Sequence, residues 1–163
     1  MKYLKRFNES LTQKELKEVK YDIEDVLVDL DDLNIKRSDE ILYKIDTYSN
    51  SSSMRAVSIS EVFRIDVRFW KNGGFFGFED FEQLKPIFDR LVRTMEKHSK
   101  DVILVISHCD EDENDCFKQM SYDEMIEYLE KEENVSGFID KKWIFHNIKR
   151  KITGFKLKFN LDK

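Results

Sequence analysis

The chain has 163 residues and a formal net charge of -5 at pH 7, and it is 40% hydrophobic and 37% charged. This length is typical of one domain with one hydrophobic core, and the 13 Phe residues supply large side chains to fill it. No apolar run approaches the roughly 20 residues that span a bilayer, and the first ten residues lack the apolar segment of a secretory signal. Two cysteines, Cys109 and Cys116, predict a reducing cytoplasm and no disulfide framework. We expect one soluble domain over residues 1–163.

Charge is distributed unevenly along the chain. Residues 101–134 carry two basic and 12 acidic groups, whereas residues 135–163 carry eight basic and two acidic groups. Segments of opposite charge either neutralise each other on one surface or face different partners. Composition alone leaves both arrangements open.

The first predicted element is a helix over about 10–33. Its apolar residues recur at spacings of three and four, which places them on one stripe, while the outer face is crowded with acids. The stripe therefore packs either on the domain itself or on a partner, which includes a second copy of the same helix. Its members are Leu16, Val19, Ile23, Val26, Leu30 and Leu33.

Alternation of apolar and polar residues predicts half-buried strands over 41–47 and 63–69. A helix follows from about 80 to 98, with Pro86 expected in its first turn. The run 102–106 is apolar at every position, which predicts a central strand that is covered on both faces.

Ser121 and Glu124 form a capping box that predicts the start of a helix reaching about residue 132. Residues 143–145 and 155–161 then read as strands that complete the sheet. Helices and strands are mixed without a regular βαβ repeat. The sequence therefore predicts an α+β fold, with a mostly antiparallel mixed sheet and about three helices in a single domain.

The acidic loop 108–116 is the most conspicuous local feature. Asp110, Asp112 and Asn114 match the first oxygen ligands of a calcium loop, but the required Gly and the final bidentate Glu are missing. His108 with the two cysteines offers three zinc ligands without a zinc-site spacing. We expect a solvated acidic turn, no bound metal and no cofactor, and whether 110–115 binds a cation stays open.

The glycine-rich turn 71–77 lies between a strand and a helix, where backbone amides can cradle phosphate. Asn72 replaces the first glycine of the dinucleotide fingerprint, and no Gly-Lys-Ser/Thr sequence of a P-loop is present. Nucleotide binding is therefore the weaker interpretation of this turn.

The densest aromatic run of the chain surrounds the same turn. Aromatic side chains are enriched at the centres of protein interfaces, although they also fill cores. We predict a partner-binding surface formed by Phe75, Phe76, Phe78 and Trp70, with core packing as the alternative.

A cationic strip near the end of the chain raises the question of nucleic-acid binding. Lys149, Arg150 and Lys151 precede Lys156 and Lys158, and the residues Arg64 and Arg68 could line the same sheet face. The negative net charge opposes this interpretation, and the acidic segment instead allows mimicry of DNA. Nucleic acid is kept as an alternative partner.

Enzymatic chemistry has little support in the sequence. The three histidines, His98, His108 and His146, have no neighbouring nucleophile motif, and carboxylate pairs carry no information in a chain with 33 acids. We therefore name no catalytic residue, and an enzyme that uses metal or nucleotide through the 108–116 loop stays an alternative.

The first ten residues, Met-Lys-Tyr-Leu-Lys-Arg-Phe-Asn-Glu-Ser, resemble the opening of small uncharacterised proteins of large tailed bacteriophages. The resemblance implies a phage origin and a viral accessory or virion protein located in the host cytoplasm or the particle. Together with the absence of a catalytic motif, it favours a non-enzymatic protein that acts through protein–protein contact.

Overall fold

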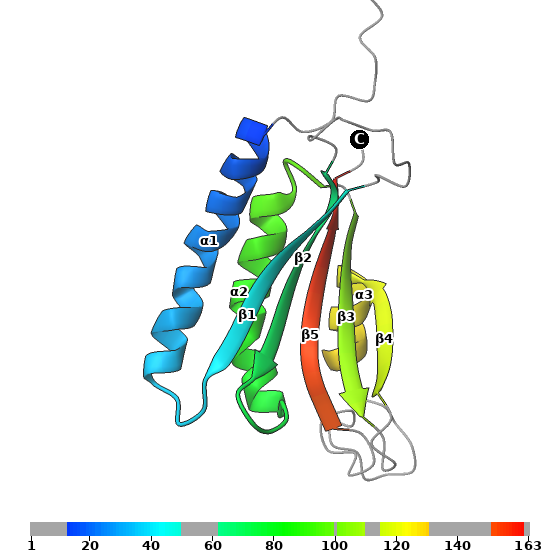
Figure 1. The fold of residues 1–163 in the computed structure, drawn as a ribbon. Coiled ribbons are helices and arrows are strands. Elements are labelled where there is room, and N and C mark those ends of the chain that lie inside the picture. The colour runs from blue at the N-terminus through cyan, green and yellow to red at the C-terminus, as the bar shows by residue number, and fades with distance from the viewer. Residues whose placement is uncertain (1–12, 50–61, 100, 110–114, 131–150, 162–163) are drawn as a thin grey trace, which may run out of the picture.

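The computed structural model describes residues 13–49, 62–99, 101–109, 115–130 and 151–161, which form three helices and one five-stranded sheet (Figure 1). The helices are α1 (Gln13–Ile35), α2 (Phe78–Met95) and α3 (Tyr122–Glu130). The strands are β1 (Ile41–Ser49), β2 (Val62–Lys71), β3 (Asp101–Cys109), β4 (Asp115–Ser121) and β5 (Lys151–Asn160). The predicted α+β class is confirmed.

The sheet has the strand order β1-β2-β5-β3-β4, and every neighbouring pair is antiparallel. The strand that comes last in chain order, β5, therefore lies at the centre, between the β1–β2 pair and the β3–β4 pair. The run 102–106 lies in β3, which is paired on both edges but is second from the edge of the sheet.

All three helices lie on one face of the sheet (Figure 1). The core between the two layers is built from alternate strand residues, among them Ile65, Phe69, Leu104, Leu157 and Phe159. Because side chains alternate along a strand, the residues between them point to the other face, which no described helix covers. Val105 points to this second face and is nevertheless only 3% exposed, so the run 102–106 is buried there although no described helix covers it.

Helix α1 packs on the domain itself. Its predicted stripe is buried, with Val19, Ile23 and Leu30 fully inaccessible, and the helix lies against α2. These stripe residues therefore pack on the domain itself, which is the first of the two placements expected from the sequence.

Helix α2 begins at Phe78, two residues before the predicted start, so Pro86 lies inside the helix and its expected place in the first turn is wrong. Proline has no backbone N–H, so the carbonyl four residues earlier in the helix lacks its usual hydrogen-bond donor. Because Pro86 is exposed, this carbonyl lies near solvent. The buried face, including Leu84, Phe88 and Leu91, agrees with the predicted spacing.

Helix α3 begins with the predicted capping box. Ser121 N–H donates to Glu124 Oε2 at 3.3 Å, and Glu124 N–H donates to Ser121 Oγ at 3.4 Å. Strand β4, which precedes the box, was not predicted from the sequence, and the predicted strand over 143–145 lies outside the described residues.

Gly154 in β5 is required by the close approach of the neighbouring strand. A Cβ at this position would lie 2.9 Å from the backbone oxygen of Phe69, whereas a Cβ at Gly77 would meet only Asp80 Oδ2 at 3.7 Å.

We expect Gly154→Ala to lower the free energy of unfolding by about 2 kcal/mol, because the β2–β5 pair must shift to accept the methyl group. Gly77→Ala, the matched control, should change stability by less than about 1 kcal/mol. Urea denaturation measures both values. Equal effects of the two substitutions would contradict the steric explanation.

Candidate functional site

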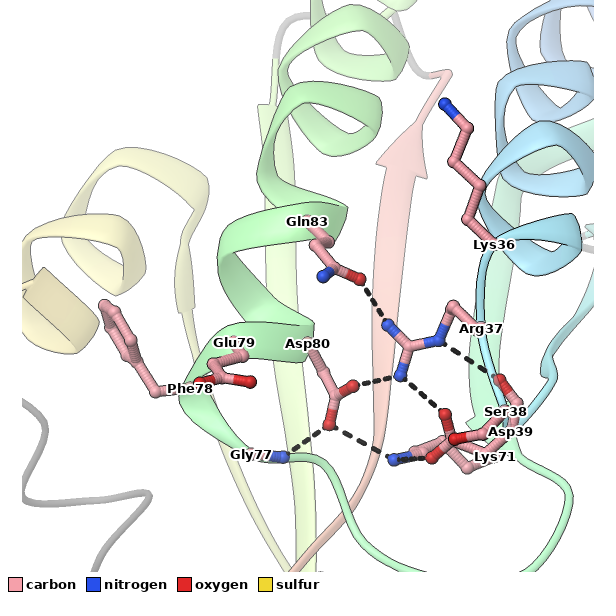
Figure 2. A pocket seen from close by; sticks show the side chains of 10 residues that line it. All are labelled: Lys36, Arg37, Ser38, Asp39, Lys71, Gly77, Phe78, Glu79, Asp80 and Gln83. Atoms are coloured by element: carbon pink, nitrogen blue, oxygen red, sulfur yellow. Dashed lines mark hydrogen bonds and ion pairs between the residues drawn. The ribbon is translucent and has the colours of Figure 1, made fainter.

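Two features of the described residues could act as a site, and the first is a hollow between the end of α1 and the first turn of α2 (Figure 2). The Arg37 guanidinium donates to Gln83, Asp39 and Asp80, and Lys71 forms ion pairs with both Asp39 and Asp80. Two cations thus meet two carboxylates, and the network satisfies its own charge.

The Asp80 carboxylate occupies the position at the start of α2 where an anionic ligand would bind the backbone amide and the neighbouring cation. Its Oδ2 accepts the Gly77 N–H at 2.7 Å and lies 3.2 Å from Lys71 Nζ. Burial would raise the pKa of Asp80, but Arg37, the Gly77 amide and Lys71 outweigh it and hold the pKa below its usual range. The amide and cations of the glycine-rich turn are therefore engaged by the chain's own carboxylate, and this hollow reads as a structural clamp.

We expect Asp80→Asn to lower the free energy of unfolding at pH 7 by about 3 kcal/mol, because Arg37 and Lys71 would keep only Asp39 as a counter-charge. Glu79→Gln, at an exposed position in the same helical turn, is the matched control and should have little effect. Urea denaturation of both variants checks this. A loss no larger than that of the control would show that the clamp is dispensable.

The four aromatic residues predicted to bind a partner do not form one surface. Phe76 is only 3% exposed and packs edge-on against Phe155, with ring centroids 5.0 Å apart, and half-buried Phe78 lies beside the buried ring of Phe81. The prediction is corrected for Phe76, because its ring belongs to the core. Trp70 and Phe75 remain accessible, at 37% and 45% exposure.

The predicted zinc ligands at the β3–β4 hairpin do not converge. His108 is paired with Cys116 and Cys109 is paired with Asp115, so the two cysteines point to opposite faces of the sheet. The residues 110–114 lie outside the described residues. Within the described ranges, no group of three or more His, Cys, Asp or Glu side chains could hold a metal ion.

The second feature is the sheet face that no described helix covers, here called the open face. Five basic side chains from β1, β2 and β5 point to it, and they surround two acids, Asp46 and Asp66. We call these five the cationic cluster: Lys44, Arg64, Arg68, Lys156 and Lys158. Lys151 adds a cation at one end of β5, while Asp101 and Asp115 add acids at the ends of β3 and β4.

Register fixes the arrangement of the cluster. Lys44, Arg68 and Lys156 form one row across three strands, because Arg68 pairs with both of the others. Lys158 lies beside Asp66 in the next row, and Arg64 lies beyond it with its guanidinium 4.3 Å from the Tyr48 ring centroid. The expectation that the two arginines share a face with the two lysines is confirmed.

The cations of the cluster are close enough to repel one another. Burial lowers the pKa of Lys158, and the neighbouring positive charges of Lys156 and Arg64 lower it further. An anion placed over the cluster would relieve this repulsion.

Among the described residues of the open face, Asp66 is the only charged side chain that is fully buried, at 0% exposure. Its Oδ1 lies 2.9 Å from Arg64 Nε and its Oδ2 lies 3.9 Å from Lys156 Nζ, yet neither oxygen has a hydrogen-bond partner. Burial raises the pKa of Asp66 above its usual range, and the three neighbouring cations compensate only in part. The ionised carboxylate is thus held in place at a cost to stability.

We expect Asp66→Asn to be more stable than the wild type at pH 7. Because the folded pKa lies above 3.8, the folded state binds the proton more tightly than the unfolded state does, so the ionised carboxylate destabilises the fold above the folded pKa. The stability difference should shrink as the pH falls through the folded pKa toward 3.8, where Asp66 itself becomes neutral. Free energies of unfolding at pH 7 and pH 4 test this, and an advantage that grows toward pH 4 would contradict it.

A second row of residues crosses the open face next to the cationic cluster and begins at Trp70. Trp70 pairs with Gly154, Gly154 pairs with Ser107, and Ser107 pairs with Phe117, so all four lie in one row across β2, β5, β3 and β4. Phe117 is 71% exposed. We call this set the aromatic row.

Sequence reasoning found four members of the cationic cluster but missed the fifth, Lys44, and it also missed Phe117 of the aromatic row. Lys44 is at a polar position of its predicted strand. Alternation along the strand would therefore have assigned it to the open face once the pairing of β1 with β2 was known. Phe117 belongs to β4, in which apolar and polar residues alternate poorly, because Lys118 shares a face with Cys116 and Met120 while Phe117 shares one with Asp115 and Gln119. The strand also follows directly on the acidic loop.

Comparison of the chain with protein-family models, with curated proteins and with solved structures gives no match. Among the described helices, none is long and apolar enough to cross a membrane.

Proposed function

We propose that this chain is a non-enzymatic binding domain whose open face holds an extended anionic partner. The observation that carries the proposal is the cationic cluster, in which five basic side chains from three adjacent strands surround two acids. Contact as the mode of action agrees with the sequence-based prediction, but the surface differs: the turn at Phe76 contributes its ring to the core.

The distribution of charge over the whole fold supports this surface. Helix α1 carries eight acids and three basic residues, and α3 carries four acids and no basic residue. The acidic surplus of α1 and α3 therefore lies on the helical side of the sheet (Figure 1), while the side chains of the cationic cluster point to the opposite face. An anionic partner is attracted to one side of the molecule and repelled from the other, in spite of the net charge of -5.

The ion pairs of the cluster leave two of its cations, Lys44 and Arg68, exposed to solvent. Arg68 lies 2.5 Å from Asp46 and Lys44 lies 3.1 Å from the same carboxylate, so one acid serves two cations. The side chains of Lys44 and Arg68 are 59% and 44% exposed. Exposed pairs of this kind contribute little to stability, so they can exchange partners at small cost.

We expect the double variant Arg68→Glu, Lys156→Glu to bind heparin, a generic polyanion, at least about tenfold more weakly, a change of about 1.4 kcal/mol. The matched control is Lys14→Glu, Lys17→Glu, which makes the same change of net charge at exposed positions of α1. Isothermal titration at two salt concentrations measures both. Equal weakening by the two double variants would show that net charge alone, and not the open face, governs the interaction.

The phage origin implied by the first ten residues stays a prediction, since the comparisons give no match that bears on it. It fits a small accessory protein that acts by contact.

A further inference from the structure

The cationic cluster and the aromatic row lie next to each other on the open face. Trp70 is two residues from Arg68 along β2, and Gly154 is two residues from Lys156 along β5. Side chains two residues apart on a strand share a face and lie about 7 Å apart. A row of cations and a row with two exposed aromatic rings thus run side by side across the sheet.

The two residues between the Trp70 and Phe117 rings are small, so no large side chain fills the space between the rings. Gly154 has no side chain and Ser107 has a small one, so Trp70 and Phe117 stand at either side of them, on strands three positions apart. With about 4.8 Å between strands, the separation is about 14 Å. One flat base held between two rings needs only about 7 Å, twice the 3.4 Å stacking distance, so each ring is placed to receive its own base.

A third exposed ring lies at the same end of the open face. Phe75 is 45% exposed, and Lys151 Nζ lies 4.9 Å from its ring centroid, three residues before Gly154. Aromatic and cationic side chains therefore alternate around this end of β5. Acidic polypeptides would use the cations alone, whereas the bases of a nucleic acid would also use the rings.

We infer that the open face binds single-stranded nucleic acid, with the cationic cluster on the phosphates and the Trp70 and Phe117 rings stacked on separate bases. The inference rests on the proposed function of the open face and names its partner. A duplex does not fit, because the DNA major groove is about 12 Å wide and admits a helix or a two-stranded ribbon, whereas the surface from β2 to β4 is broader. Unstacked bases of a single strand can lie flat on a sheet face.

The test compares four fluorescein-labelled probes by anisotropy: a 15-nucleotide oligo-dT, the matching oligo-rU, an abasic oligonucleotide of the same length, and a 15-base-pair duplex. We expect the first two to bind at least about fivefold more tightly than the abasic strand, because stacking adds to the phosphate contacts. Their ratio shows whether the sugar is distinguished. Poly-L-glutamate and heparin are measured as competitors.

Two variants separate stacking from charge. Phe117→Ala should weaken oligo-dT binding at least about fivefold and leave abasic binding unchanged. Lys156→Gln should weaken both and reduce the slope of log K against log salt by about 0.7, which Phe117→Ala should not change. Tyr21→Ala on α1, at 67% exposure, is the matched aromatic control and should change neither value.

Each outcome has one meaning. Equal affinity for oligo-dT and the abasic strand, with no effect of Phe117→Ala, would overturn the inference and leave the proposed function standing. Tighter binding of poly-L-glutamate than of oligo-dT, or equal binding of the duplex, would do the same. Failure of all polyanions, including heparin, to bind would overturn the proposed function itself.

Discussion

All three described helices pack on one face of the five-stranded sheet, and this arrangement decides the chemistry of both faces. Five antiparallel strands send successive side chains to opposite faces, and the helices lie on one of them. Apolar residues such as Ile65, Val67 and Phe69 must point toward the helices, so the residues between them, Arg64, Asp66 and Arg68, must point away. The charge of the open face is thus a direct consequence of how the core is built.

Asp66 illustrates the limit of this alternation. A carboxylate that is buried on the open face without a hydrogen bond destabilises the fold, yet it lies where the like charges of Arg64, Lys156 and Lys158 would otherwise repel one another without relief. The side chain therefore holds neighbouring cations together at the expense of stability. Residues that lower the stability of the fold in this way are typical of functional surfaces.

Much of the fold could be predicted because it depends on local patterns. The stripe of α1 and the buried face of α2 repeat at helical spacing, and the capping box of Ser121 and Glu124 is a short-range motif. Pro86 misled the prediction of the first turn of α2, because proline fits best in the first turn of a helix. It is also tolerated inside a helix where the carbonyl that loses its hydrogen bond lies near solvent.

The candidate site was only half predictable for a physical reason. Parity within one strand places Arg64 and Arg68 on one face, and the same rule places Lys156 and Lys158 together. The position of Phe117 beside Ser107, and of Ser107 beside Gly154, depends on the register of two separate strand pairs. Register is set by long-range pairing, which no local pattern of this chain reveals.

The central place of β5 has a consequence for how the chain reaches its fold. Its partners β2 and β3 precede it by tens of residues, so the β1–β2 and β3–β4 pairs can form locally while the sheet stays divided. Completing the sheet requires β5 to insert between the edges of β2 and β3 and to form hydrogen bonds with both. These contacts join distant parts of the chain, so forming them costs loop-closure entropy. Assembly of the two halves is therefore expected to be the slow event of folding, and each half would expose an unpaired edge until β5 arrives.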